Sequence, residues 1–132
     1  MAHDPPICRE RIRETLDLIA NKWAVPIFVE LTRSTTPLRF SELSRAIPGI
    51  TQKELTKQLR ELESAKLVSR TVYPVVPPKV EYALTDLGRS LQPVMDALAR
   101  WADQYAGVLA ANKAAAAQTT SSDARENHHA DR

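Results

Sequence analysis

The chain has 132 residues, of which 43% are hydrophobic and 26% charged, and its formal net charge is +2. This length suffices for one domain with a modest core, and the small net charge argues against a protein that coats nucleic acid without sequence preference. A local basic patch remains compatible with it, because residues 51–79 hold six Lys or Arg against three Glu. The single cysteine, Cys8, excludes an intrachain disulfide and favours a reducing compartment. No apolar run reaches the ~20 residues of a membrane span, so we expect a cytoplasmic protein without membrane contact.

Residues suited to catalysis or metal binding are sparse. The three histidines, His3, His128 and His129, fall in expected tails, which excludes a histidine-based triad or zinc site in the body. The three glycines lie far apart and form no phosphate-binding loop. We therefore expect no enzymatic activity, no metal and no cofactor.

The first half of the chain predicts helices. Residues 1–7 are a polar, proline-containing lead. Helical spacing begins near Cys8 and places apolar residues on one face: Ile12, Leu16 and Ile19. Asn21 ends this helix or caps the next one, which spans about residues 23–31 and is the most apolar segment of the chain. Residues 38–40 follow as a very short predicted strand.

Residues 41–65 predict a helix-turn-helix. Ser41 is the expected cap of the first helix, and Pro48-Gly49 ends it. Thr51 and Glu54 have the Thr-x-x-Glu spacing of a capping box, which starts the second helix. The apolar stripe of that helix is formed by Leu55, Leu59 and Leu62. The pattern thus predicts one buried and one polar face for the second helix.

The polar face of the second helix is basic. Lys53, Lys57 and Arg60 lie opposite the leucines, with Thr56 beside them. Such a row on the second helix of a helix-turn-helix suits the major groove of DNA. An ordinary solvated helix face is the alternative at this point.

Two segments after this helix predict a β-hairpin. Residues 67–73 are rich in β-branched residues, and residues 79–84 alternate between apolar and polar, with prolines in the connection. A hairpin directly after a recognition-type helix is a wing. Arg70, Tyr73 and Lys79 on this wing are placed to reach phosphates or the minor groove, and a plain solvated hairpin is the alternative. The fold class is therefore α+β, mostly helical: a winged helix-turn-helix.

The last predicted element is a long helix beginning at Thr85 or Asp86. Its apolar residues recur at steps of four and three, nearly a heptad seam, with a kink expected at Pro93. The seam includes Leu91, Val94, Leu98, Trp101 and Tyr105. A helix this long exceeds what one small core covers, so a second copy of the chain is the expected partner. Folding back over the core of its own chain is the alternative. We expect one domain over residues 8–111 and a disordered polar tail over 112–132.

Several of these stretches resemble the HxlR family of winged helix-turn-helix transcription regulators, within the wider MarR-like group. The most specific are Pro48-Gly-Ile-Thr51 and Val76-Pro-Pro-Lys-Val-Glu-Tyr82, and the resemblance covers about residues 8–107. Relatives often carry two glycines before Lys22-Trp23, where this chain has Ala20 and Asn21. That difference affects the helix junction and leaves the expected fold unchanged.

The resemblance implies a homodimer held by the N- and C-terminal helices, with Ile12 and the seam at its interface. It also implies recognition helices in successive major grooves and a palindromic double-stranded DNA operator with half-sites ~34 Å apart. By position, the recognition helix supplies Thr51, Gln52, Lys53, Thr56, Lys57 and Arg60. The wing supplies Arg70, Tyr73 and Lys79.

Cys8 is the candidate sensing residue. Some members of the family respond to oxidants or electrophiles through a thiol near the start of the chain, usually followed by proline; here Arg9 follows Cys8. A cation and a helix N-terminus both favour the reactive thiolate. A partly buried thiol without a role is the alternative.

Two other function classes stay open from the residues. One is a winged-helix module that binds another protein, although protein interfaces tend to deplete lysine. The other is a sensor of a small-molecule effector, with a pocket near Trp23, Trp101 and Tyr105 and no DNA readout. Aromatic residues at such spacing belong more often to a core.

Overall fold

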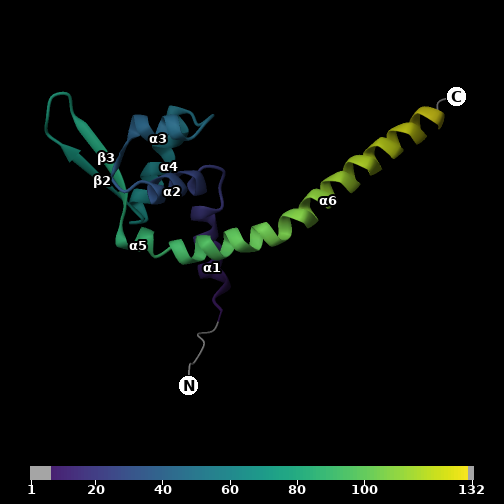
Figure 1. Ribbon diagram of the computed structural model, residues 1–132, viewed down its shortest axis with the longest axis horizontal. Helices are drawn as coiled ribbons and strands as arrows, with labels where there is room; N and C mark the ends of the chain where they lie inside the picture. The colour runs from purple at the N-terminus through teal and green to yellow at the C-terminus, as the bar shows by residue number, and fades with distance from the viewer. Residues whose placement is uncertain (1–6, 131–132) are drawn as a thin grey trace, which may run out of the picture. The chain divides into compact units, whose positions relative to one another are not determined.

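The structure, a computed structural model, describes residues 7–130, with side chains described up to residue 118. Residues 1–6 and 131–132 lie outside the described residues, and with them His3 and most of the expected N-terminal lead. The chain divides into two units, Met1–Leu91 and Gln92–Arg132. We describe each unit by itself (Figure 1).

The first unit carries five helices and three strands among its described residues. In chain order they are α1 (Arg9–Ile19), α2 (Ala24–Arg33), β1 (Leu38–Arg39), α3 (Phe40–Ala46), α4 (Gln52–Ser64), β2 (Val68–Tyr73), β3 (Lys79–Leu84) and α5 (Asp86–Arg89). The second unit contains α6 (Gln92–Ala130). The predicted helix-turn-helix and wing are both present, and the fold class is confirmed: a mostly helical winged helix-turn-helix with a small antiparallel sheet.

The sheet places the wing beside the helices. Its strand order is β1-β3-β2, and both pairs are antiparallel. The hairpin of β2 and β3 projects from the helices of this unit (Figure 1). One face of β3 is buried at Tyr82 and Leu84, opposite Val68 of β2. Because this face packs on the helices, the opposite face of the hairpin is left to solvent.

The core is built from the apolar stripes of three helices. The most deeply buried side chains are Ile27, Leu43, Leu55 and Leu59. They belong to α2, α3 and α4, so the turn between α3 and α4 is fixed by burial on both sides. Burial of each Leu or Ile stabilises the fold by about 1.5–3 kcal/mol. The position of α4 is therefore set by its leucines, which leaves its other face free.

The junction of α1 and α2 is capped by one side chain in both directions. The Asn21 side-chain oxygen accepts hydrogen bonds from the backbone N–H groups of Trp23 (3.1 Å) and Ala24 (2.9 Å). Its amide nitrogen donates to the Leu18 carbonyl at 3.1 Å. Asn21 thus both ends α1 and begins α2, where the sequence had left two alternatives.

The expected cap of α3 was wrong by two residues. Arg39 is the N-cap, and its backbone N–H donates to the Glu42 carboxylate at 3.1 Å, so Ser41 lies inside the helix. The pairing of Arg39 with Glu81 in the sheet holds Arg39 extended, and the chain turns directly afterwards. A tertiary contact therefore decided where this helix begins.

The long helix expected from residue 85 is interrupted. The short helix α5 ends at Arg89, and the separate helix α6 begins at Gln92. Pro93 therefore lies in the first turn of α6, where a missing N–H leaves no hydrogen bond unmade, and the expected internal kink is absent. Leu91 falls in the connection, outside the seam on α6.

The C-terminal segment also differs from expectation. We expected a disordered tail from Asn112, whereas α6 continues to Ala130. The segment has no proline or glycine after Gly107 and contains four consecutive alanines, Ala114 to Ala117. Alanine has the highest helix propensity, which favours continuation of α6 from Asn112 through Ala117.

Candidate nucleic-acid interface

The first turn of α4 is fixed by the predicted capping box. The Thr51 hydroxyl accepts from the Glu54 N–H at 3.1 Å, and the Glu54 carboxylate accepts from the Thr51 N–H at 3.0 Å. That backbone hydrogen bond is the main cause that holds the pKa of Glu54 below its usual range, so the carboxylate stays charged. Thr51, predicted to contact DNA, has its hydroxyl engaged in this cap.

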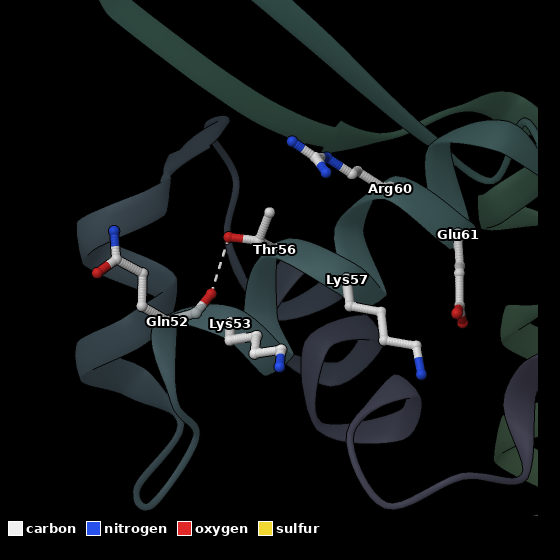
Figure 2. A pocket seen from close by; sticks show the side chains of 6 residues that line it. All are labelled: Gln52, Lys53, Thr56, Lys57, Arg60 and Glu61. Atoms are coloured by element: carbon white, nitrogen blue, oxygen red, sulfur yellow. Dashed lines mark hydrogen bonds between the residues drawn. The ribbon is translucent and has the colours of Figure 1, made fainter.

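The basic row of α4 is exposed as predicted. Lys53, Lys57 and Arg60 are exposed, while Leu55, Leu59 and Leu62 of the same helix are buried. The three cations line an open groove along the helix, together with Gln52, Thr56 and Glu61 (Figure 2). Among the residues that the structure describes, no carboxylate forms an ion pair with any of the three cations. Their charge is therefore available to an anionic partner.

Two polar residues complete this face. The Thr56 hydroxyl donates to the Gln52 carbonyl at 2.8 Å, shown as a dashed line in Figure 2. This hydroxyl keeps its lone pairs for a further donor. The Gln52 side chain is exposed at the N-terminal end of the row. An amide followed by cations along one helix presents the groups that bind base edges and phosphates.

The three predicted wing residues do not share one face. Residues directly opposite in an antiparallel pair point to the same face. Arg70 pairs with the buried Tyr82, so it lies on the face that packs on the helices, beyond the core. Tyr73 pairs with Lys79 on the opposite face. The sequence placed these residues on the wing correctly but did not separate the two faces.

The tip of the wing has no charge. From Thr71 to Pro78 the chain contains no ionisable group except the Tyr73 phenol. Val75 is half exposed, and Val76 is completely exposed. The tip therefore offers apolar contact to a partner, and Lys79, the first cation beside it, pairs with Tyr73 at the tip end of the hairpin.

Sequence reasoning missed Glu81. Its carboxylate lies 2.8 Å from the Lys79 ammonium, so Lys79 has a partner within the wing. The sequence could have predicted this ion pair, because residues two apart in a strand, such as Lys79 and Glu81, point to the same face. The further neighbour Arg39 comes from another strand and required the structure.

The residues predicted for a subunit interface carry exposed apolar surface. Ile12 lies on the amphipathic helix α1. An amphipathic helix usually buries its apolar residues, yet Ile12 is 49% exposed. Within α6, Leu98 is 48% and Trp101 57% exposed, and Trp101 stacks on Tyr105 with ring centroids 5.1 Å apart. Val94 is exposed on the same stripe, whereas Leu91 is half-buried outside α6. Exposed apolar stripes of this length favour a protein partner.

Cys8 is the N-cap of α1. It is a free cysteine of intermediate burial, with Arg9 next to it at the start of the helix. Within the described part of the chain, no three His, Cys, Asp or Glu residues gather closely enough to hold a metal ion. Among the same residues, no helix is apolar enough over sufficient length to cross a membrane.

Comparison with known proteins identifies the family. The model of the HxlR-like helix-turn-helix family matches residues 18–109. The chain belongs to the HxlR family. An HTH-type transcriptional regulator of Methanothermobacter thermautotrophicus is 46% identical over 105 residues, covering 80% of this chain and 77% of that protein. YtcD, an HTH-type transcriptional regulator of Bacillus subtilis, is 49% identical over 90 residues, covering 68% and 70%.

Solved structures agree with this assignment. The redox regulator HypR in its reduced form shares 43% identity with a TM-score of 0.68, covering 75% of this chain and 96% of that one. Reduced YodB from B. subtilis shares 37% identity with a TM-score of 0.68, covering 75% and 94%. This HxlR-family chain is thus a transcriptional regulator of the helix-turn-helix type with a winged-helix fold.

Proposed function

We propose that this regulator binds a palindromic double-stranded DNA operator as a homodimer and reads its sequence through α4. The observation that carries the proposal is the row of exposed cations on α4, Lys53, Lys57 and Arg60, which have no ion-pair partner among the described residues. A major groove about 12 Å wide admits such a helix. The proposed contacts on α4 are Thr51, Gln52, Lys53, Thr56, Lys57 and Arg60, supported on the wing by Arg70, Tyr73 and Lys79.

The homodimer is supported by apolar surface that one chain leaves exposed. Ile12 and Leu16 are each 49% exposed on α1, and the stripe of Val94, Leu98, Trp101 and Tyr105 runs along α6. A second copy offers identical stripes, which suits a two-fold interface. Such symmetry brings two α4 helices to half-sites one DNA turn apart, ~34 Å.

Selection from a randomised DNA pool at two salt concentrations tests the proposal. The expected result is an enriched palindromic motif with half-sites one helical turn apart. Weak binding without enrichment, lost at the higher salt, would show only nonspecific charge attraction and reject the proposal.

Lys57→Ala is expected to weaken operator binding. Loss of this contact costs about 1–3 kcal/mol, a change of roughly 5- to 150-fold in Kd, if the ammonium binds a base. If it binds a phosphate, the loss is similar for all sequences and the salt dependence falls by about one ion. Titration of labelled operator at several salt concentrations separates the two.

Lys113→Ala is the matched control for that variant. It removes the same charge from an exposed position on α6, beyond the residues that match the family model. Its operator affinity should stay within about twofold of wild type, because Lys113 belongs to neither the helix-turn-helix nor the wing. Equal affinity of Lys57→Ala and Lys113→Ala would remove Lys57 from the interface.

We also propose that Cys8 makes DNA binding responsive to a thiol-reactive signal. The support is its place at the N-terminus of α1, whose apolar face belongs to the proposed dimer interface. Among similar proteins, HypR has been solved in reduced and oxidised forms and YodB after treatment with diamide. Modification at this position would alter how two α1 helices pack and so change the spacing of the recognition helices.

Cys8→Ser tests this response. Diamide is expected to change the operator affinity of wild type, and a thiol reductant to restore it, because the thiol is the oxidisable group. The serine variant should bind DNA normally and show no response. A response of Cys8→Ser equal to that of wild type would contradict the role of Cys8.

One observation favours a second role for the wing. Its exposed, uncharged tip, centred on Val75 and Val76, is suited to contact with another protein. If Val76→Ser leaves the operator affinity and motif unchanged, the tip does not contribute to DNA readout.

A further inference from the structure

The solvent-facing side of the wing carries a compact group of charges. Arg39 lies opposite Glu81 in the β1–β3 pair, and Tyr73 lies opposite Lys79 in the β2–β3 pair. Because opposed residues and residues two apart in a strand share a face, all four belong to one face. We call Arg39, Tyr73, Lys79 and Glu81 the wing cluster.

The contacts of Lys79 within the wing cluster hold its charge against the sheet. The ammonium lies 2.8 Å from a Glu81 carboxylate oxygen and 5.1 Å from the centroid of the Tyr73 ring. The Tyr73 hydroxyl donates to the other Glu81 oxygen at 3.4 Å. The side chains of Lys79 and Glu81 are only 35% and 15% exposed, so this ion pair is screened less than a freely exposed pair.

The Glu81 carboxylate is kept in its charged form. The hydrogen bond from Lys79 is the largest cause that holds the pKa of Glu81 below its usual range, and the charge of Arg39 adds to it. At neutral pH the wing cluster therefore contains one anion among two cations. In the free protein, the Glu81 carboxylate already balances the positive charge of Lys79, a predicted DNA contact.

We propose that Glu81 is a specificity-determining residue, whose carboxylate competes with DNA phosphates for the Lys79 ammonium. The inference rests on the proposed DNA binding and adds the way in which the wing discriminates. Nonspecific binding comes almost entirely from cations that replace counterions on phosphates. A lysine already paired with a carboxylate contributes little to the free energy of nonspecific binding.

The operator complex differs in geometry. When α4 is seated in its groove, the wing is held at one place along the backbone, and a phosphate stays close to the cluster. Lys79 can then exchange the carboxylate for the phosphate without further loss of freedom. In loose nonspecific complexes phosphates pass the wing cluster only briefly and do not displace the carboxylate, so Lys79 contributes little to nonspecific binding while Glu81 is present.

Glu81→Gln tests the inference, because glutamine keeps the shape and an acceptor for Tyr73 and removes the charge. Binding is measured on the selected operator and on an unrelated duplex of equal length, across salt concentrations. We expect the unrelated duplex to bind roughly threefold to tenfold tighter, with a salt slope steeper by about one ion. Operator affinity should rise by a smaller factor, because Lys79 already binds the held phosphate in the wild-type complex, and specificity therefore falls.

Two further variants separate the loss of this ion pair from a general change of net charge. Glu14→Gln removes the same charge from an exposed position on α1 and should leave both affinities within about twofold. Lys79→Ala should leave binding to the unrelated duplex nearly unchanged, and the double variant Lys79→Ala/Glu81→Gln should lose most of the gain. A change of net charge alone does not produce such coupling between the two residues.

The outcomes are distinct. An equal gain in Glu14→Gln, no gain in Glu81→Gln, or an equal change on both duplexes would overturn the inference and leave the proposed function standing. If Glu81→Gln does not fold, a fall of a full ion in the salt slope of Lys79→Ala on unrelated DNA overturns it as well. A wild-type protein that selects no motif would instead reject the proposed function.

Discussion

Gly88→Ala is expected to destabilise the first unit by about 3 kcal/mol, near the upper end for overpacking. A Cβ atom at this position would overlap the Leu67 carbonyl oxygen and lie 3.2 Å from a Leu84 methyl group. The close neighbour is backbone and cannot rotate away. The same carbonyl also accepts a hydrogen bond from the Thr85 N–H at 3.0 Å, which holds α5 against the start of β2. For a domain of this size the melting temperature should fall by roughly 15 °C.

Gly107→Ala is the matched control for this prediction. Nothing lies within 4 Å of the added methyl group, and Gly107 is inside α6. The substitution should stabilise that helix by about 1 kcal/mol, because glycine is a poor helix former. Thermal unfolding followed by circular dichroism compares the two. A Gly88→Ala protein that melts within about 2 °C of wild type would show that α5 moves away at little cost.

Leu98→Glu is expected to separate the proposed dimer. Leu98 is 48% exposed in one chain and lies in the middle of the α6 stripe, so the substitution should not disturb the fold of the chain. Burying each leucine contributes about 1.5–3 kcal/mol, and a carboxylate placed there must also be desolvated. Since both subunits change, the dimer should weaken by at least about 100-fold. Sedimentation equilibrium measures this directly.

Ala110→Glu provides the matched control. It lies about 120° around α6 from Leu98, is also exposed, and adds the same charge. Its dimer constant should equal that of wild type. With Leu98→Glu, operator binding should fall together with dimerisation, because a lone recognition helix contacts one half-site. A Leu98→Glu protein that remains dimeric would place the subunit interface elsewhere.

Local sequence patterns were sufficient to predict most of the helices and strands. The period of the leucines predicted α4 and its buried face, and the spacing of Thr51 and Glu54 predicted its first turn. These predictions hold because a helix that buries one stripe and caps its own end depends on residues only three or four positions apart. The exposure of Lys53 and Lys57 follows from the same period.

The end of α4 could not be predicted from local sequence patterns. Lys66 adopts a positive φ of 66°, and the Leu67 N–H donates to the Leu62 carbonyl at 3.0 Å. This termination usually carries glycine, so a lysine here offers no local signal for it. The neighbouring strand β2 and the contact with Thr85, whose hydroxyl donates to the Lys66 carbonyl, hold the lysine in this conformation.

Composition and periodicity alone were enough to predict a winged helix-turn-helix with a basic recognition helix, since each depends on neighbours in the chain. The tertiary structure decided which wing residues act together. Arg70 lies on the packed face, and Lys79 is paired with Glu81 beside Arg39. Strand register sets these relations, and register depends on pairing between segments more than forty residues apart in the case of β1 and β3. The ionic partner of a cation is therefore fixed by the fold, whereas the cation itself is visible in the sequence.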